Sequence, residues 1–450
     1  MTRLSLALAA TALLGVSLLA APTNARPKQD IDRAMLAQQA ERVIEQRRMI
    51  DVSRISRCAP RRRDNQLDYS RWVCEWRGAG VWPGEVPYRC KGDATWSARR
   101  DIWRVAKCKN QMQPRVPLLA EPGPAPMFGY NDDWAQRSNA TIDLMALTEP
   151  DTARAALPWA TVESSQGTYE WTRVDRVYEK LRARGIRPLW ALIEAPCWAQ
   201  PIPSACRDGK NQLRPAPQHY EALARFAAAA ARRYPAAVGI EVWNEPNYPR
   251  FWGAWPQPDL YAEMLARVAD AIHAAAPGMT VVSAGLSPHS DSDRHAIGFG
   301  NFLTALYESG AAQKADAIGI HPYPGGGPEE DHVDAMRIQL GKVDLIMGRY
   351  GDDATPMWAT ELGISTSGAQ AFTPADQAQA LVDLYSTTRR IAGLPLVVVH
   401  RFLEQPALGE REAGFGVVSG SENGFLGLFA AELTRKPAYC ALNKIRAVDC

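Results

Sequence analysis

Short apolar runs alternate with helix-like stretches along the chain from residue 127 onward. Runs rich in β-branched and aromatic residues that end at turn residues are typical of buried strands. Eight of them occur, at Met127–Tyr130, Arg154–Leu157, Arg187–Ile193, Val238–Trp243, Thr280–Ala284, Ala317–Ile320, Met357–Thr360 and Leu396–Val399. Apolar residues recur at helical spacing in the segments Val174–Arg184, Tyr220–Arg233, Leu260–Ala275, Asn301–Ser309, Val333–Arg349, Pro374–Ile391 and Ala430–Lys444. Eight strands separated by helices predict an α/β fold, the (β/α)8 TIM barrel. A doubly wound open sheet is the alternative, but it would need a Gly-rich first turn that this chain lacks.

The first quarter of the chain has a different pattern. Short β-like pieces at Tyr69–Trp76 and Asp101–Cys108 alternate with Gly and Pro turns, and five of the 14 Trp residues lie between 54 and 108. A domain this small needs Trp residues and disulfides to build a core, although exposed Trp faces would also suit a sugar-binding or cell-wall-binding module. We therefore expect a small disulfide-stapled, β-rich domain at 54–108. A helical lead-in at 26–53 precedes it, and a Pro-rich linker at 109–126 joins it to the barrel at 127–450.

The N-terminus and the cysteines together indicate export. Residues 1–25 combine Arg3, an apolar stretch and a small-residue cleavage pattern, as in a secretory signal peptide. An uncleaved anchor helix is the alternative, and no later segment is long and apolar enough to span a membrane.

Eight cysteines, an even number, suggest disulfides in an exported chain. We expect Cys197 to pair with Cys206 and Cys440 to pair with Cys450. The remaining four leave three connectivities open: Cys58, Cys74, Cys90 and Cys108. No CxxC spacing or nearby His favours a zinc site, so no metal site is expected.

Charge is distributed unevenly along the chain. The formal net charge is +2, but residues 26–116 carry 21 Lys and Arg against 11 Asp and Glu, which is +10. With Arg3 counted separately, −9 is left for residues 117–450. A basic front piece is suited to docking onto an anionic cell-envelope polymer. It is equally suited to attraction toward the acidic main body.

Two of the expected strands end in a glutamate. Glu245 follows the run that begins at Gly239, and Glu361 ends the run that begins at Met357. The rim at the carboxyl ends of barrel strands carries the chemistry in this fold, and paired carboxylates cleave glycosidic bonds. Neighbouring negative charge would keep Glu245 protonated as a general acid, and Glu361 would attack as a nucleophile. A helix cap is the alternative for Glu245 alone.

Several stretches of residues 125–445 resemble glycoside hydrolase family 39, which belongs to the clan A of retaining (β/α)8 glycosidases. The segment Trp243–Asn247 (WNEPN), followed by Phe251 and Trp252, resembles the acid/base segment of the family. Trp358–Gly363 (WATELG) resembles the nucleophile strand of the clan, and Ile318–Pro324 (IGIHPYP) resembles its sixth strand. A further stretch is similar to the second strand and its loop, with Arg154, Trp159, Glu163, Gly167, Tyr169, Trp171 and Asp175.

This resemblance implies a role for each matching residue. Glu245 is the implied acid/base and Glu361 the implied nucleophile. Asn244 would bind the hydroxyl next to the anomeric carbon, and Arg154 would orient Glu361 and lower its pKa. Other residues expected to contact the sugar or shape its wall are His321, Tyr323, Trp159, Trp198, Trp252 and Arg401. The chain departs from the clan at strand eight, where His400, Arg401 and Phe402 stand in place of the usual Trp.

The main hypothesis is therefore a secreted retaining glycoside hydrolase that cleaves a poly- or oligosaccharide by double displacement without a cofactor. The alternative is a catalytically silent carbohydrate-binding or cell-envelope-anchored barrel protein, although the presence of both carboxylates argues against silence. Nucleic-acid binding is disfavoured because the basic region is cysteine-rich and joined to a sugar-cleaving motif set. Neither a Gly-x-Ser-x-Gly elbow nor a His-Glu-x-x-His zinc motif is present.

Overall fold

The computed structural model divides into two compact units, Met1–Met112 and Gln113–Cys450. Backbone alone is described for 51–63, 66–79, 88–97 and 102–110; side chains are also described within 115–203, 206, 213–289, 296–325, 327–405, 412–421 and 432–450, apart from residue 421. The predicted signal peptide and residues 26–50 of the predicted helical lead-in lie outside the described residues.

The first unit contains a four-stranded antiparallel sheet in the order β1-β2-β3-β4. Its strands are β1 (Asp51–Arg63), β2 (Gln66–Ala79), β3 (Tyr88–Ser97) and β4 (Ile102–Asn110). The predicted β-rich character of this region is therefore confirmed, and its first strand includes the end of the segment expected to be helical. The register places Cys58 directly opposite Cys74. The disulfides expected among the first four cysteines lie outside the described side chains.

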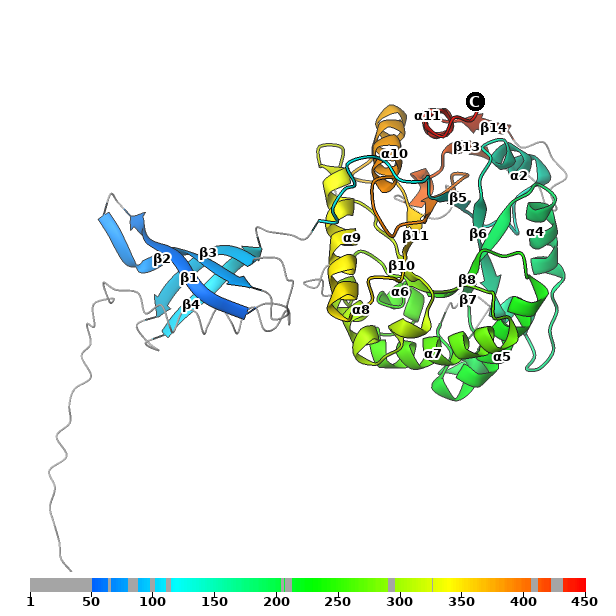
Figure 1. Ribbon diagram of the computed structural model, residues 1–450, viewed down its shortest axis with the longest axis horizontal. Helices are drawn as coiled ribbons and strands as arrows, with labels where there is room; N and C mark the ends of the chain where they lie inside the picture. Colours follow the sequence, from blue (N-terminus) through cyan, green and yellow to red (C-terminus); the bar gives the residue numbers. More distant parts are fainter. Residues whose placement is uncertain are drawn as a thin grey trace, which may run out of the picture. The chain divides into compact units, whose positions relative to one another are not determined.

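The second unit is built on eight parallel strands, which confirms the predicted (β/α)8 barrel (Figure 1). The strands are β5 (Met127–Asn131), β6 (Thr152–Pro158), β7 (Arg187–Ile193), β8 (Gly239–Asn244), β9 (Val281–Gly285), β10 (Ile318–Ile320), β11 (Met357–Leu362) and β12 (Leu396–His400). Their order is β10-β11-β12-β5-β6-β7-β8-β9. Parallel bridges from Val282 to Ala317 and from Leu286 to Ile320 close the ring between β9 and β10.

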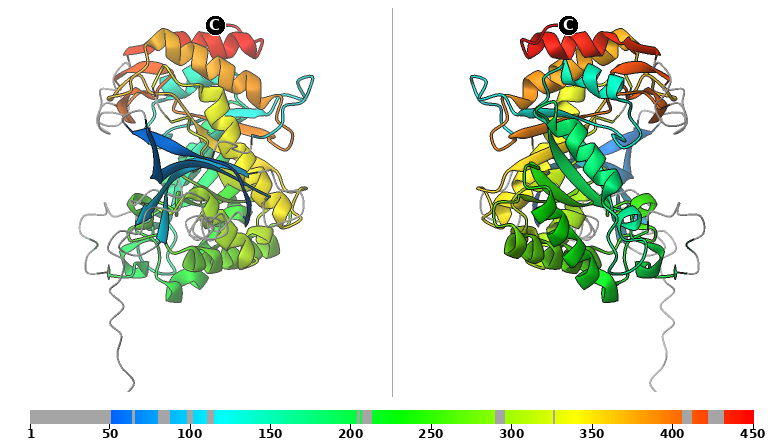
Figure 2. Two further views of the ribbon diagram at one scale, coloured as in Figure 1. Left: turned by 90° about the vertical axis from the view of Figure 1, so that its left-hand side faces the viewer. Right: turned by 90° about the vertical axis from the view of Figure 1, so that its right-hand side faces the viewer.

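The longer helices lie outside the strands and cover the barrel, and two four-residue helices lie in the loops after β6 and β8. They are α2 (Asn139–Ala146), α3 (Trp159–Val162), α4 (Thr172–Arg182), α5 (Tyr220–Arg233), α6 (Pro249–Trp252), α7 (Pro258–Ala275), α8 (Phe299–Glu308), α9 (His332–Arg349), α10 (Pro374–Thr388) and α11 (Pro437–Ile445). Figure 2 shows α10 and α11 side by side at one edge of the barrel and α5 beside α7 at the opposite edge. Short 3-10 turns lie at Cys197–Ala199, Pro217–His219, Ala312–Lys314 and Glu412–Gly414.

Two hydrophobic clusters hold this unit together. The larger cluster lies between the strands and the helices, and the smaller one fills the lower barrel interior with Leu189, Val238, Val282, Ala317, Trp358, Leu396 and Val398. Because these interior residues alternate along the strands with residues that face the helices, they close the barrel below the rim. The upper interior is consequently left to the polar side chains of the site.

Two predicted boundaries differ from the structure. The second unit begins at Gln113, because the described part of the Pro-rich segment lies along the barrel: Val116 is 3% exposed and its N–H donates to the carbonyl of Arg337. The helix expected at Ala430–Lys444 begins at Pro437, and Glu432–Arg435 forms β14, paired with β13 (Val418–Ser421). Proline fits only the first turn of a helix, so Pro437 sets the start of α11.

Two predicted disulfides are confirmed. Cys197 is bonded to Cys206, and Cys440 is bonded to Cys450. The first ties the loop after β7, and the second fastens the last residues to α11. None of the described helices is long and apolar enough to cross a membrane.

Candidate active site

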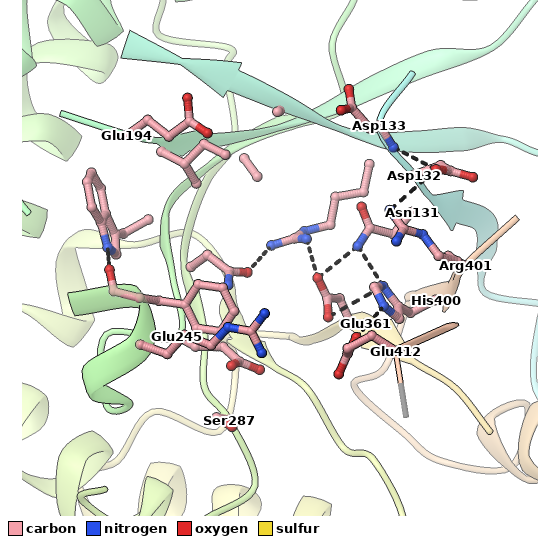
Figure 3. A pocket seen from close by; sticks show the side chains of 18 of the residues that line it. Asn131, Asp132, Asp133, Glu194, Glu245, Ser287, Glu361, His400, Arg401 and Glu412 are labelled. Carbon is pink, nitrogen blue, oxygen red and sulfur yellow. Dashed lines mark hydrogen bonds and ion pairs between the residues drawn. The ribbon is translucent and has the colours of Figure 1, made fainter. Parts of the chain in front are cut away.

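The two predicted catalytic carboxylates lie at the same rim of the barrel. Glu245 directly follows β8, and Glu361 lies near the end of β11. Both line one cavity of about 930 Å³ at the carboxyl ends of the strands, and each residue is 8% exposed. Figure 3 shows some of the side chains that line this cavity. Two strands separated by more than 100 residues therefore place their terminal acids in a single hollow.

The distance between the two carboxylates is short. One oxygen of each lies within 4.8 Å of the other and of a ring nitrogen of His321. Nδ1 of His321 is 2.8 Å from Oε1 of Glu245 and 3.6 Å from Oε2 of Glu361. Carboxyl groups about 5–5.5 Å apart act on opposite sides of one anomeric carbon, whereas about 6.5–9.5 Å leaves room for a water. This spacing favours direct attack by a carboxylate.

Glu361 is held by three hydrogen bonds. Nη1 of Arg154 and Nδ2 of Asn131 donate to Oε1, at 2.5 and 2.8 Å. The hydroxyl of Tyr323 donates to Oε2 at 2.7 Å. Donors on both oxygens fix the carboxylate plane and favour the ionised form.

The pKa of Glu361 is accordingly displaced. Burial by itself would raise it. The rings of His321 and His400 and then the guanidinium of Arg154 outweigh burial and hold this pKa below the usual range of a glutamate. The same carboxylate, after burial itself, raises the pKa of the Tyr323 hydroxyl well above its ordinary value. Glu361 is thus an ionised nucleophile candidate beside a hydroxyl that stays protonated.

Arg154, on β6, connects the nucleophile candidate to Asn244. Its Nη2 donates to Oδ1 of Asn244 at 2.8 Å, which leaves the amide NH2 of Asn244 as the group that can donate to a ligand. Its Nε donates to Oε2 of Glu241 at 2.6 Å. Arg154 is 4% exposed and Glu241 fully buried, so one cation is shared by two buried acids.

His321 completes the floor of the site. It is fully buried just after β10 and reaches Glu245, which follows β8, past the end of the intervening strand β9. A glycine at 285 makes this approach possible, because a Cβ there would fall 2.1 Å from Nε2 of the ring. Burial would lower the pKa of His321, but Glu361 and Glu245 outweigh it and raise this pKa. His321 therefore links both acids through its charge as well as its hydrogen bond.

The rim also holds unusual backbone conformations. Trp243, Glu245 and Glu194 have φ values of 81°, 41° and 61°. This left-handed region costs a non-glycine residue about 1–3 kcal/mol and is found mainly at functional sites. Two of the three residues are acids that line the cavity.

The structure brings six predicted site residues together and places the three predicted tryptophans outside the cavity lining. Glu245, Glu361, Asn244, Arg154, His321 and Tyr323 form one connected network. Trp159 and Trp252 are fully buried in the core, so the expectation that they contact sugar is wrong. Trp198 packs edge-on against Trp159 and donates to the carbonyl of Glu163, outside the cavity lining. The indole rings of these residues fill buried space behind the loops. The sequence alone does not distinguish this packing role from stacking on a sugar ring.

His400, the last residue of β12, and Arg401, which follows it, have different surroundings. His400 lies 3.7 Å from Oε2 of Glu361 and packs edge-on against Tyr323 and Phe415. Arg401 lines the cavity as predicted, and its Nη2 lies 3.4 Å from Oδ1 of the buried Asp132. The place expected for an aromatic platform is thus occupied by an imidazole beside the nucleophile candidate.

Several site residues were missed in the sequence. Asn131 ends β5 and bonds Glu361, and Glu412 lies 3.7 Å from Nε2 of His400. Glu241 and Glu194 were also missed. Glu241 had a signal, a lone charge inside an apolar strand, which is rare unless the charge is paired. Asn131 and Glu194 had a weaker sequence signal, because they are polar residues at the ends of predicted strands.

Glu245, His321 and Glu361 also form, within the described part of the chain, a group of metal-ligand type. Arg154 already supplies positive charge to Glu361 at 2.5 Å, so a cation would compete with it. The donor set therefore suits proton transfer and nucleophilic attack better than metal binding.

Comparison with known proteins identifies the fold. No family model and no curated protein matches the chain. Among solved structures, a family 39 glycoside hydrolase from the gut symbiont Bacteroides cellulosilyticus WH2 matches with TM-score 0.55 and 18% identity, over 86% of this chain and 76% of its own. A monomeric beta-xylosidase from Caulobacter crescentus CB15 matches with TM-score 0.51 and 20% identity, over 74% and 71%. An exo-beta-1,4-mannosidase from Opitutaceae bacterium strain TAV5 matches with TM-score 0.51 and 19% identity, over 74% and 61%. At these identities the likeness establishes the shared (β/α)8 fold.

Proposed function

We propose that this chain is a retaining glycoside hydrolase of the family 39 type, which cleaves O-glycosidic bonds of an oligo- or polysaccharide. The observation that carries the proposal is the pair Glu245 and Glu361, with carboxylate oxygens within 4.8 Å at one rim. That separation fits the roughly 5–5.5 Å of retaining enzymes rather than the larger inverting distance. Similar folds in proteins named as glycosidases add support from outside the chain.

The reaction has two displacements. In the first, a carboxylate oxygen of Glu361 attacks the anomeric carbon while Glu245 donates a proton to the glycosidic oxygen, whose bond to that carbon breaks. The leaving group departs as an alcohol, and the sugar stays bound as an ester of Glu361. In the second, Glu245 takes a proton from water, the water oxygen attacks the same carbon, and the ester bond breaks. Two inversions retain the configuration.

The surrounding residues prepare each step. Arg154, Asn131 and Tyr323 hold Glu361 ionised and in plane, so its attacking geometry exists before substrate binds. The amide of Asn244, turned by Arg154, donates to the hydroxyl beside the anomeric carbon. His321 lies within 2.8 Å of Glu245 and so fixes the acid over the same carbon.

Azide rescue tests the two roles separately. Glu361→Ala should abolish hydrolysis of activated aryl glycosides, and azide should restore turnover with a glycosyl azide of inverted configuration. Glu245→Ala should keep a slow first step with activated leaving groups, and azide should give a glycosyl azide of retained configuration. Undiminished activity in Glu361→Ala, or the same azide product from both variants, would remove this mechanism.

We further propose that the protein acts outside the cytoplasm. The pattern in residues 1–25 supports removal of a signal peptide, and the +10 charge of residues 26–116 supports contact with an anionic cell-envelope polymer. N-terminal sequencing of the mature protein should begin near residue 26. Binding of the full chain to an anionic polysaccharide should weaken as salt rises. A mature protein that starts at Met1 would contradict removal of a signal peptide.

A further inference from the structure

His400 ends β12 directly opposite Asn131, the last residue of the adjacent parallel strand β5. Nδ2 of Asn131 lies 2.9 Å from Nδ1 of His400 and 2.8 Å from Oε1 of Glu361. One amide group therefore bridges the imidazole ring and the carboxylate of the nucleophile candidate. Figure 3 shows the three side chains together at one side of the cavity.

The chemistry of these groups determines which of them donate. An ionised carboxylate only accepts hydrogen bonds, so Asn131 must turn its NH2 group, and not its carbonyl oxygen, toward Glu361. The second hydrogen of the same NH2 group is then available to Nδ1 of His400. A ring nitrogen that accepts this hydrogen carries none itself, so the proton of a neutral His400 ring lies on Nε2.

Glu412 lies beside the other nitrogen of the ring. Its Oε2 is 3.7 Å from Nε2 of His400, which is the nitrogen that carries the proton. The neighbouring His400 ring is the first cause that lowers the pKa of Glu412, so this residue stays an ionised partner for that proton. The carboxylate of Glu412 therefore favours the same tautomer that the amide of Asn131 requires.

Two aromatic rings hold the plane of the His400 ring. Phe415 and Tyr323 pack edge-on against it, with ring centroids 5.2 and 5.9 Å away, and only 12% of the His400 side chain is exposed. Tyr323 also donates to Oε2 of Glu361. His400 thus contacts two of the three residues that hold the nucleophile candidate, Asn131 and Tyr323.

We propose that His400 and Glu412 are positioning residues for Glu361. Glu412 keeps the proton of His400 on Nε2, and Nδ1 accepts one amide hydrogen of Asn131. Asn131 then directs its other amide hydrogen at Oε1 of Glu361. This inference rests on the proposed hydrolase function, in which Glu361 attacks the anomeric carbon. An imidazole in the place of the usual Trp thus supports the nucleophile instead of stacking on the sugar.

The proton on His400 can be observed without substrate. In protein labelled with 15N-histidine, the chemical shift of each ring nitrogen shows whether it is protonated, and the signals lost in His400→Asn assign this ring. At neutral pH, Nε2 should be protonated and Nδ1 unprotonated in the wild type. In Glu412→Ala the Nδ1-protonated form should increase. A protonated Nδ1 in the wild type, or unchanged shifts in Glu412→Ala, would overturn the proposal.

Kinetics test what this arrangement does for the nucleophile. A panel of aryl glycosides first identifies the accepted sugar, and its phenyl glycoside, with a poor leaving group, makes the first displacement limiting. In His400→Leu, which has no acceptor for Asn131, kcat should fall at least about tenfold, equal to about 1.4 kcal/mol, with little change in KM. His400→Asn offers a carbonyl oxygen near the position of Nδ1, and its kcat should exceed that of His400→Leu about fivefold.

A direct contact between His400 and the sugar predicts a different result, in which KM rises and kcat is kept. That result in His400→Leu, or equal kcat in the two His400 variants, would overturn the positioning role in proteins with wild-type circular dichroism.

His273→Leu is the matched control. His273 also pairs with a carboxylate, 2.8 Å from Asp316, but it lies outside the cavity lining. This variant should keep the kcat and KM of the wild type. A wild-type protein that hydrolyses no aryl glycoside or oligosaccharide would reject the hydrolase proposal, whereas the histidine spectra would by themselves support or overturn the hydrogen-bond arrangement.

Discussion

Glu241 is fully buried beneath the two rim acids, and its replacement by glutamine tests whether it positions Arg154. Three donors converge on its carboxylate. Gly285 N–H and the hydroxyl of Thr360 donate to Oε1, at 2.8 and 2.7 Å, and Nε of Arg154 donates to Oε2 at 2.6 Å. In Glu241→Gln one of these oxygens becomes an NH2 group. If the amide oxygen keeps the hydrogen bonds from Gly285 and Thr360, the new NH2 group faces Nε of Arg154. Two hydrogen-bond donors then face each other without an acceptor between them.

The expected loss of stability in Glu241→Gln follows from the burial of its ion pair with Arg154. Removing one partner of a buried ion pair costs about 3–5 kcal/mol. Arg154 keeps its bond to Glu361, so the lower end applies, about 3 kcal/mol of unfolding free energy. At roughly 2 °C per kcal/mol for a unit of this size, Tm should fall by about 6 °C. A small displacement of Arg154 also misaligns Glu361 and Asn244, so kcat should fall by roughly 10–100-fold.

Calorimetry measures the change in Tm, and steady-state kinetics on an activated aryl glycoside measure the change in kcat. The pH profile separates positioning from bulk stability: without the Glu241 charge, Arg154 acts on Glu361 alone and holds its pKa lower still, so any acidic limb of kcat/KM set by Glu361 shifts to lower pH. The control is Glu263→Gln, which removes an exposed pair with Arg267 and should shift Tm by about 2 °C at most. Equal Tm, kcat and pH profile in the two variants would refute the reasoning.

Two further predictions concern pH and reduction. Because the folded pKa of His321 is raised, the stability that it contributes is fully present below its unfolded pKa of about 6.5 and is lost as pH rises through the folded value. Tm should therefore decline above about pH 6.5 in the wild type and less so in His321→Gln; parallel curves would contradict this. Reducing agent should destabilise residues 54–108 more than the barrel, because a domain that small would depend on the expected disulfides for its stability. Hydrogen exchange resolved by segment checks this, and equal loss of protection in both units would argue against a stapled domain.

The barrel could be predicted because its signals are local. Strands such as β7 and β8 are apolar runs bounded by turn residues, and each lies within two residues of the predicted position. The start of α11 at Pro437 shows the limit of local signals. The helical pattern continued back to residue 430, but pairing of β14 with β13 places Glu432–Arg435 in a strand. Strand pairing can override a local helix propensity, because the backbone hydrogen bonds between two strands involve a second segment. That segment lies outside the stretch of sequence from which the helix was predicted.

The sequence by itself determined that Glu245 and Glu361 stand at strand ends, because a strand that ends in a carboxylate is visible in a few neighbouring residues. Only the tertiary structure decided their partners. The contacts of Glu241 with Arg154, Gly285 and Thr360 span 87, 44 and 119 residues, and those of Glu361 with Arg154 and Asn131 span more than 200. The structure also decided that Trp159 and Trp252 fill the core, since an indole ring suits a buried space as well as a sugar face. Closing the ring of strands is what brings such distant side chains to one rim, and no short stretch of sequence records that closure.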